Sequence, residues 1–172
     1  MSDPQSESVT APPRDFETAL HMGDKLELRV WLRLLTCSTL LEKRIRARLR
    51  DAFDITLPRF DVLAQLNRSP DGLTMGDLSG RLMVSAGNIT GLIERLTQEG
   101  MVSRTPAPQD RRTQRVRLTE TGKRIFDEMA STHQGWVEEA LEGLDRQEMQ
   151  NLLDLLGRLK TSLNGTEETD HG

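Results

Sequence analysis

Apolar side chains recur at helical spacing along most of this chain. Residues 24 to about 50 hold no Pro or Gly and carry one wide apolar stripe, which predicts a long helix. A stripe this wide indicates burial on more than one side, as in a helix that packs on its own domain and on a partner. The stripe consists of Leu26, Val30, Leu34, Leu41 and Ile45, widened by Trp31, Leu35 and Leu40.

Shorter apolar patterns follow and predict three compact helices. Pro58 fits the first turn of the second helix, where a missing N–H is harmless. Thr74 with Asp77 forms a capping pair that begins a third helix, ending at about Met83. Ser85 is a suitable N-cap for a fourth helix, which ends at Gly100.

After Gly100 the spacing of apolar residues changes from helical to alternating. Residues 101–105 and 114–118 read as paired strands, and in the second strand apolar and cationic positions alternate. Thr119 is expected to cap a fifth helix that runs to about Leu144, and Asp145 opens a Leu-rich sixth helix. The order of these predicted helices and strands indicates a mainly α fold with a helix-turn-helix, a small β-hairpin wing and long N- and C-terminal helices.

The fourth helix is the first candidate for function. Opposite its apolar stripe, small and polar side chains at its N-terminal end would let the helix approach base edges closely in the major groove. These positions are Ser85, Ala86, Gly87, Asn88, Thr90, Gly91, Glu94 and Arg95. Taken alone, the pattern equally fits an ordinary amphipathic helix with a polar outer face.

The hairpin tip favours the DNA-reading interpretation. Arg111 and Arg112 lie together near two prolines that stiffen the loop, and Asp110 can pair with one of them. Two arginines held this close fit an anionic partner, and arginine suits a narrow minor groove. The alternative is a solubilising charged loop.

Composition supports a helical protein with an uneven charge distribution. Aromatic residues make up 3% of the chain, there is no Tyr, and the net charge is −4. The basic residues gather around the hairpin, whereas the segment from Ile125 onward is strongly acidic. This split would turn the hairpin toward a polyanion. Apolar residues are too few for a large core, so subunits that share a core would relieve the shortage.

The ordered set of motifs between about Trp31 and Leu159 resembles the MarR family of bacterial winged helix-turn-helix regulators. The resemblance rests on Leu57-Pro58-Arg59-Phe60-Asp61, Ser85-Ala86-Gly87-Asn88-Ile89-Thr90, Gly100-Met101-Val102, and Asp110-Arg111-Arg112 leading to Val116-Arg117-Leu118-Thr119-Glu120-Thr121-Gly122. It implies a homodimer with intertwined terminal helices, bound to a pseudopalindromic operator and usually released by a small effector.

The residue patterns and the resemblance together predict an organisation and a set of contacts. A tail (1–23) expected to be disordered precedes a winged-helix domain (24–163), and a flexible tail (164–172) follows. Within the domain, the DNA-binding lobe would span about 56–122, between dimerisation helices at about 24–50 and 119–163. The expected DNA contacts are Thr74, Ser85, Gly87, Asn88, Thr90, Arg95, Asp110, Arg111 and Arg112.

The family places an effector pocket between the dimer helices and the winged lobe. The residues most able to line it are Trp31, Phe60, His133 and Trp136, although core packing fits each of them singly. The pattern around Trp31 and Phe60 is similar to members that control aromatic-acid catabolism and sense aromatic carboxylates or their CoA thioesters. We therefore expect a repressor released by an effector of that kind.

Other chemistry finds little support in the sequence. The three histidines are far apart and no Cys or His cluster accompanies Cys37, so we expect no metal site. No nucleophile motif or phosphate-binding loop is present in the sequence, so we expect neither a cofactor nor enzyme activity. Cys37 reads as a buried small hydrophobe or, as an alternative, a redox sensor without the Tyr partners of related regulators. A winged helix used only for protein interaction is the rival function. Without a signal sequence or an apolar span, a cytoplasmic location is expected.

Overall fold

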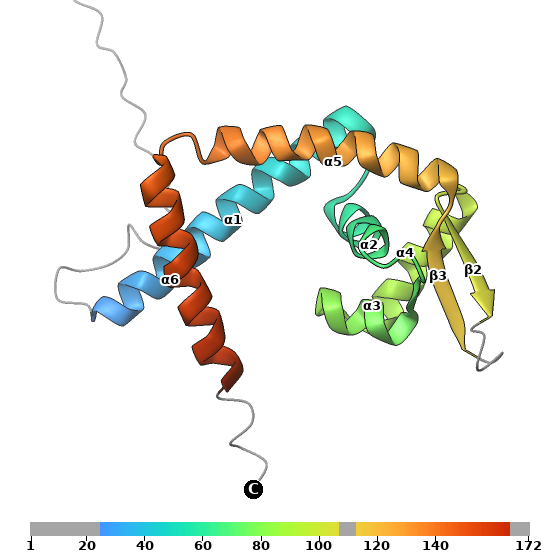
Figure 1. Cartoon of the computed structure of the whole chain (residues 1–172), viewed down its shortest axis with the longest axis horizontal. Coiled ribbons are helices and arrows are strands. Elements are labelled where there is room, and N and C mark those ends of the chain that lie inside the picture. The colour runs from blue at the N-terminus through green and yellow to red at the C-terminus, as the bar shows by residue number, and fades with distance from the viewer. Residues whose placement is uncertain (1–24, 107–112, 166–172) are drawn as a thin grey trace, which may run out of the picture. The chain divides into compact units, whose positions relative to one another are not determined.

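The computed structural model describes residues 25–106 and 113–165, and the chain divides into two compact units at the bond between Thr56 and Leu57. In these residues the secondary structure is mainly helical, as the sequence predicts, with a small antiparallel sheet (Figure 1). The elements are α1 (Leu26–Phe53), α2 (Leu57–Asn67), β1 (Leu73–Thr74), α3 (Met75–Leu82), α4 (Ala86–Gln98), β2 (Val102–Pro106), β3 (Gln114–Leu118), α5 (Glu120–Ala140) and α6 (Arg146–Gly165).

The first unit is helix α1, which runs three residues further than the sequence pattern indicates. It ends where Asp54 adopts a left-handed conformation, with the Asp54 N–H bonded to the Arg50 carbonyl and the Ile55 N–H bonded to the Leu49 carbonyl. The expected burial of Cys37 is wrong for the single chain, because the stripe around it is uncovered: Leu40 is exposed, and Leu34 is only half-buried.

The second unit contains the winged-helix lobe, and helix α2 lies at its centre. Helix α2 contacts α3, α4, α5 and strand β3. It can do so because apolar side chains surround it on several sides, and Val62, Leu63 and Leu66 are among the most deeply buried of the chain. The core continues through Leu78 of α3 to Val116 of β3. A lobe built on one central helix holds its neighbours in fixed positions.

The sheet has three strands rather than the two that the sequence predicts. Strands β2 and β3 pair antiparallel with Arg104 opposite Val116, and β1 joins the other edge of β3 with Leu73 opposite Val116. Two residues are too short to show a strand period, so β1 leaves no sequence signal. It ties the start of α3 to the wing.

Helix α5 begins with a close approach to the end of α4. Thr119 caps it by accepting the Gly122 N–H at 2.9 Å, and the Thr119 N–H donates to the Met101 carbonyl at 3.0 Å. Gly122 is buried there, and a Cβ on it would lie 1.9 Å from the Met101 oxygen. The expected Thr119 cap is confirmed, while α5 ends at Ala140, earlier than expected.

Helix α6 presents its leucines to solvent in the single chain. Each of its residues from Arg146 to Gly165 is exposed, although the helix carries a full apolar stripe. The exposed large side chains are Met149, Leu152, Leu153, Leu155, Leu156, Leu159 and Leu163. An apolar area of this size is rarely left in water by a stable chain.

Candidate nucleic-acid interface

Helix α4 separates cleanly into a buried and an exposed side. Ile89, Ile93 and Leu96 are completely buried, as their spacing predicts. The predicted contact residues on the other side, Gly87, Asn88, Thr90 and Arg95, are all exposed. The structure therefore brings this part of the predicted site together on one helix face.

The N-terminal end of α4 is suited to an anion. Ser85 is the N-cap, and its hydroxyl accepts the Asn88 N–H at 3.4 Å, as expected. The first turn holds no acidic residue, so no carboxylate neutralises the positive end of the helix dipole. Exposed backbone N–H groups at such an end are a common phosphate-binding arrangement.

Thr74 lies at the N-cap of α3 and uses its hydroxyl for the predicted capping box. The hydroxyl accepts the Asp77 N–H at 3.1 Å and donates to the Asp77 carboxylate at 2.8 Å, while the Thr74 N–H donates to the same carboxylate at 3.0 Å. These bonds from Thr74 stabilise the ionised form and lower the pKa of Asp77 below its ordinary value. The cap holds the first turn of the helix-turn-helix in place.

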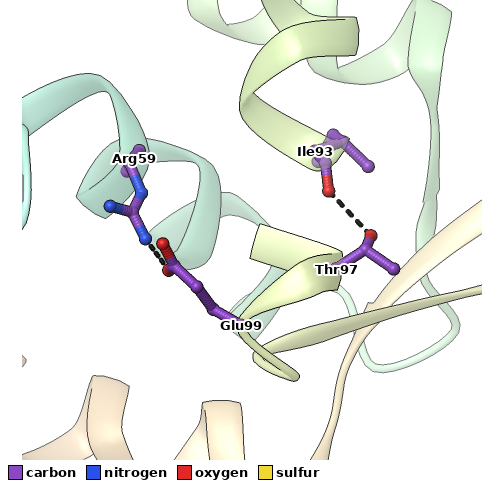
Figure 2. A network of polar contacts seen from close by, with 4 residues as sticks. All are labelled: Arg59, Ile93, Thr97 and Glu99. Atoms are coloured by element: carbon purple, nitrogen blue, oxygen red, sulfur yellow. Dashed lines mark hydrogen bonds and ion pairs between the residues drawn. The ribbon is translucent and has the colours of Figure 1, made fainter. Parts of the chain in front are cut away.

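The C-terminal end of α4 is anchored to α2 by an ion pair that the sequence did not reveal. Arg59 of α2 donates to the carboxylate of Glu99, the C-cap residue of α4, as Figure 2 shows. Two residues before Glu99, the Thr97 hydroxyl donates to the Ile93 carbonyl at 2.7 Å (Figure 2). The two charged partners are 40 residues apart, and no local pattern connects positions so distant.

The base of the wing is fixed by the arginines of β3. Arg115 donates to the Gly72 carbonyl at 3.0 Å, and Arg117 donates to the Asp71 carbonyl at 3.0 Å. The turn itself requires Gly72, whose φ is +77° and whose hydrogen faces Arg117 and the Val116 carbonyl. The alternating cationic positions of this strand therefore have a structural role. The predicted tip contacts Asp110, Arg111 and Arg112 lie outside the described residues.

The predicted effector residues are only partly brought together. Phe60 is buried in α2, and its ring centroid lies 4.8 Å from that of His133 in α5 and 5.6 Å from that of Phe126. Burial disfavours the charged imidazole and lowers the pKa of His133 below 6.5. Trp136 is half-buried one turn further along α5, whereas Trp31 belongs to the other unit and is 59% exposed.

None of the helices in residues 25–106 and 113–165 combines the length and the apolar character that a membrane-spanning helix requires. No group of three or more His, Cys, Asp or Glu side chains in those segments is arranged to hold a metal ion.

Comparison with known proteins places the fold in a family. A model described as the MarR family matches residues 53–113. A solved MarR family transcriptional regulator from Silicibacter pomeroyi is 33% identical, with a TM-score of 0.69 over 80% of this chain and 94% of that one. The chain belongs to the MarR family. The resemblance drawn from the ordered motifs is thereby confirmed, as is the winged-helix fold.

Two other similar proteins bear on the function of this chain. The transcriptional activatory protein BadR of Rhodopseudomonas palustris is 36% identical over 110 residues, which are 62% of each chain, so the match spans about three fifths of BadR. A mutant of MarR from E. coli, solved in complex with operator DNA, is 27% identical with a TM-score of 0.68, over 79% of this chain and 99% of that one. The name of BadR is that of a transcriptional protein, and the E. coli MarR mutant was solved bound to operator DNA.

Proposed function

We propose that this MarR-family chain is a transcriptional repressor that reads operator DNA with helix α4. The observation that supports this most directly is the capped, acid-free N-terminus of α4, with Gly87 and Asn88 exposed beside it. Small residues there would let the helix approach base edges, and Asn88 has the paired donor and acceptor that match adenine. Thr74, Thr90 and Arg95 would add contacts, and the wing tip with Asp110, Arg111 and Arg112 would reach the minor groove.

The proposed reader is a homodimer. The exposed leucines of α6 support it, because a second chain could cover them, and the exposed apolar residues of α1 independently call for a similar cover. A two-fold symmetric protein would read a pseudopalindromic operator with half-site centres about 34 Å apart. We place it in the cytoplasm, where a bacterial operator lies.

A small effector would release the protein from its operator. The aromatic cluster of Phe60, His133 and Phe126, with Trp136 nearby, supports an aromatic ligand such as an aromatic carboxylate or its CoA thioester. Because Phe60 is buried in the free chain, the effector would have to displace its ring. It can shift the equilibrium only by the difference in its affinity for the two conformations.

The test is binding of the full chain to the DNA upstream of its own gene, compared with a scrambled duplex of the same composition. We expect preferential, salt-dependent binding to the first duplex. Replacing Asn88 by Ala should reduce the difference in binding free energy between the two duplexes by about 1–3 kcal/mol, the usual contribution of a paired base contact. An Arg112→Ala chain should bind both duplexes more weakly with a flatter salt dependence.

The outcomes separate the proposal from its alternatives. Absence of salt-dependent binding to any duplex would instead support a protein-interaction module. Transcription from the bound promoter distinguishes repression from activation, which matters because BadR is named an activator. The exposed Cys37 supports a redox-responsive regulator only if oxidation changes operator affinity and a Cys37→Ser chain does not respond.

A further inference from the structure

Two charges in the lobe lie at helix ends that disfavour them. Arg59 is in the first turn of α2, where the helix dipole favours anions, and Glu99 is at the end of α4, where it favours cations. Neither placement is explained by its own helix. Each is explained by the ion pair between them, which is therefore a specific tertiary contact between α2 and α4.

The surroundings make this contact stronger than a surface ion pair. The Arg59 side chain is 10% exposed and that of Glu99 is 40% exposed, so water screens the pair only on one side. Loss of the Glu99 carboxylate would remove a counter-charge from the nearly buried guanidinium of Arg59, whereas Glu99 without Arg59 would still be partly solvated. The pair therefore holds one orientation of α4 relative to α2.

The end of α4 that carries Glu99 is also fixed from the wing side. Gly100 has a φ of +72° and ends the helix, with the Met101 N–H bonded to the Leu96 carbonyl at 2.9 Å. The Thr119 hydroxyl donates to the Gly100 carbonyl at 2.6 Å. The C-terminal end is thus anchored on two sides, while the exposed face of the N-terminal end is open to a ligand.

Because α4 is anchored at its C-terminal end, a small rotation there displaces its N-terminal end by a larger distance. From Glu99 to Asn88 the helix rises about 16 Å, so a rotation of about 5° at the anchored end would move Asn88 by roughly 1.4 Å. A displacement of that size is enough to break a direct hydrogen bond to a base edge. Contacts to phosphates, which rest on longer-range charge attraction, tolerate it much better.

We propose that Arg59 and Glu99 are positioning residues for sequence reading: their ion pair sets the angle at which α4 presents Asn88 to the bases, without touching DNA. The inference rests on the proposed DNA-reading function. It predicts a loss of discrimination between DNA sequences when the pair is broken, with general DNA affinity maintained.

The sharpest test uses Glu99→Gln. Loss of the negative charge and loss of the α4 orientation predict opposite changes in affinity for the selected DNA. Removing a carboxylate from a DNA-binding lobe should strengthen binding to every duplex if charge alone matters. If position matters, affinity for a duplex selected from a random pool by the wild-type chain should fall about tenfold, a factor corresponding to 1.4 kcal/mol. Affinity for a scrambled duplex should stay the same or rise.

Controls separate positioning from folding and from charge. Glu128→Gln removes an exposed carboxylate from α5 and should leave the ratio of the two affinities unchanged. Partial unfolding lowers the active fraction for both duplexes alike, so it does not alter that ratio. Arg59→Gln should lower the ratio as Glu99→Gln does, and the double variant should be no worse than either single one.

The results decide each proposal separately. An unchanged affinity ratio in Glu99→Gln, measured by fluorescence anisotropy at one salt concentration, would overturn the positioning role while leaving the DNA-reading function intact. If the wild-type chain selects no duplex at all, the proposed function fails first, and the positioning role fails with it.

Discussion

At the scale of single residues, Gly122 shows how little space the lobe leaves between α5 and the end of α4. A Cβ there would meet the Met101 carbonyl, which is backbone and cannot move aside cheaply. Replacing Gly122 by Ala should therefore lower the free energy of unfolding by about 1–3 kcal/mol, the cost of a forced backbone shift. Thermal and urea unfolding of the purified chain measure it.

Gly135 of the same helix supplies the matched control. A Cβ at Gly135 would meet nothing within 4 Å, so Ala should raise stability there by about 0.5–1 kcal/mol through its better helix propensity. Opposite signs for the two substitutions are the expected result. Equal effects would mean that the approach of Gly122 to Met101 is not tight in solution.

At the scale of elements, the contact between α2 and α5 should depend on pH. Burial lowers the pKa of His133 below 6.5, so below that pH the unfolded chain binds a proton that the folded chain resists. The contribution of His133 to stability is complete above pH 6.5 and declines as the pH falls toward the lowered pKa. Urea unfolding at a series of pH values should show this decline.

A His133→Gln chain isolates the origin of that decline. It lacks the titrating ring beside Phe60, so its stability should fall less than that of the wild type between pH 6.5 and 5. If both chains lose the same stability across this range, other groups are responsible. The contact would then be insensitive to the charge of residue 133.

At the scale of the whole molecule, the proposed homodimer should depend on the exposed leucines of α6. Leu159→Glu places a charge in the centre of the exposed apolar stripe and should shift the chain from dimer to monomer at micromolar concentration. Gln150→Glu adds the same charge nine residues away, half a turn around the helix, and should leave the dimer intact. Light scattering after size exclusion measures both, and a dimeric Leu159→Glu chain would exclude this stripe from the interface.

Local signals in the sequence were sufficient to predict most elements and the exposed face of α4. The Thr74–Asp77 box, the Ser85 and Thr119 caps and the helix end at Gly100 are confirmed, because each depends on residues within a few positions of one another. The two-residue strand β1 was missed for the opposite reason. It exists only because β3, more than 40 residues later, pairs with it.

The amino-acid sequence by itself determined the order of helices and strands, their caps, the buried stripe of α4 and the family. Only the tertiary structure decided that Arg59 holds Glu99, that Arg115 and Arg117 bond to the turn carbonyls, and that Gly122 lies against Met101. Helical periods and caps are short-range properties that one segment can encode. A contact between distant positions requires the fold itself, because the sequence spacing of its partners carries no information about their distance in space.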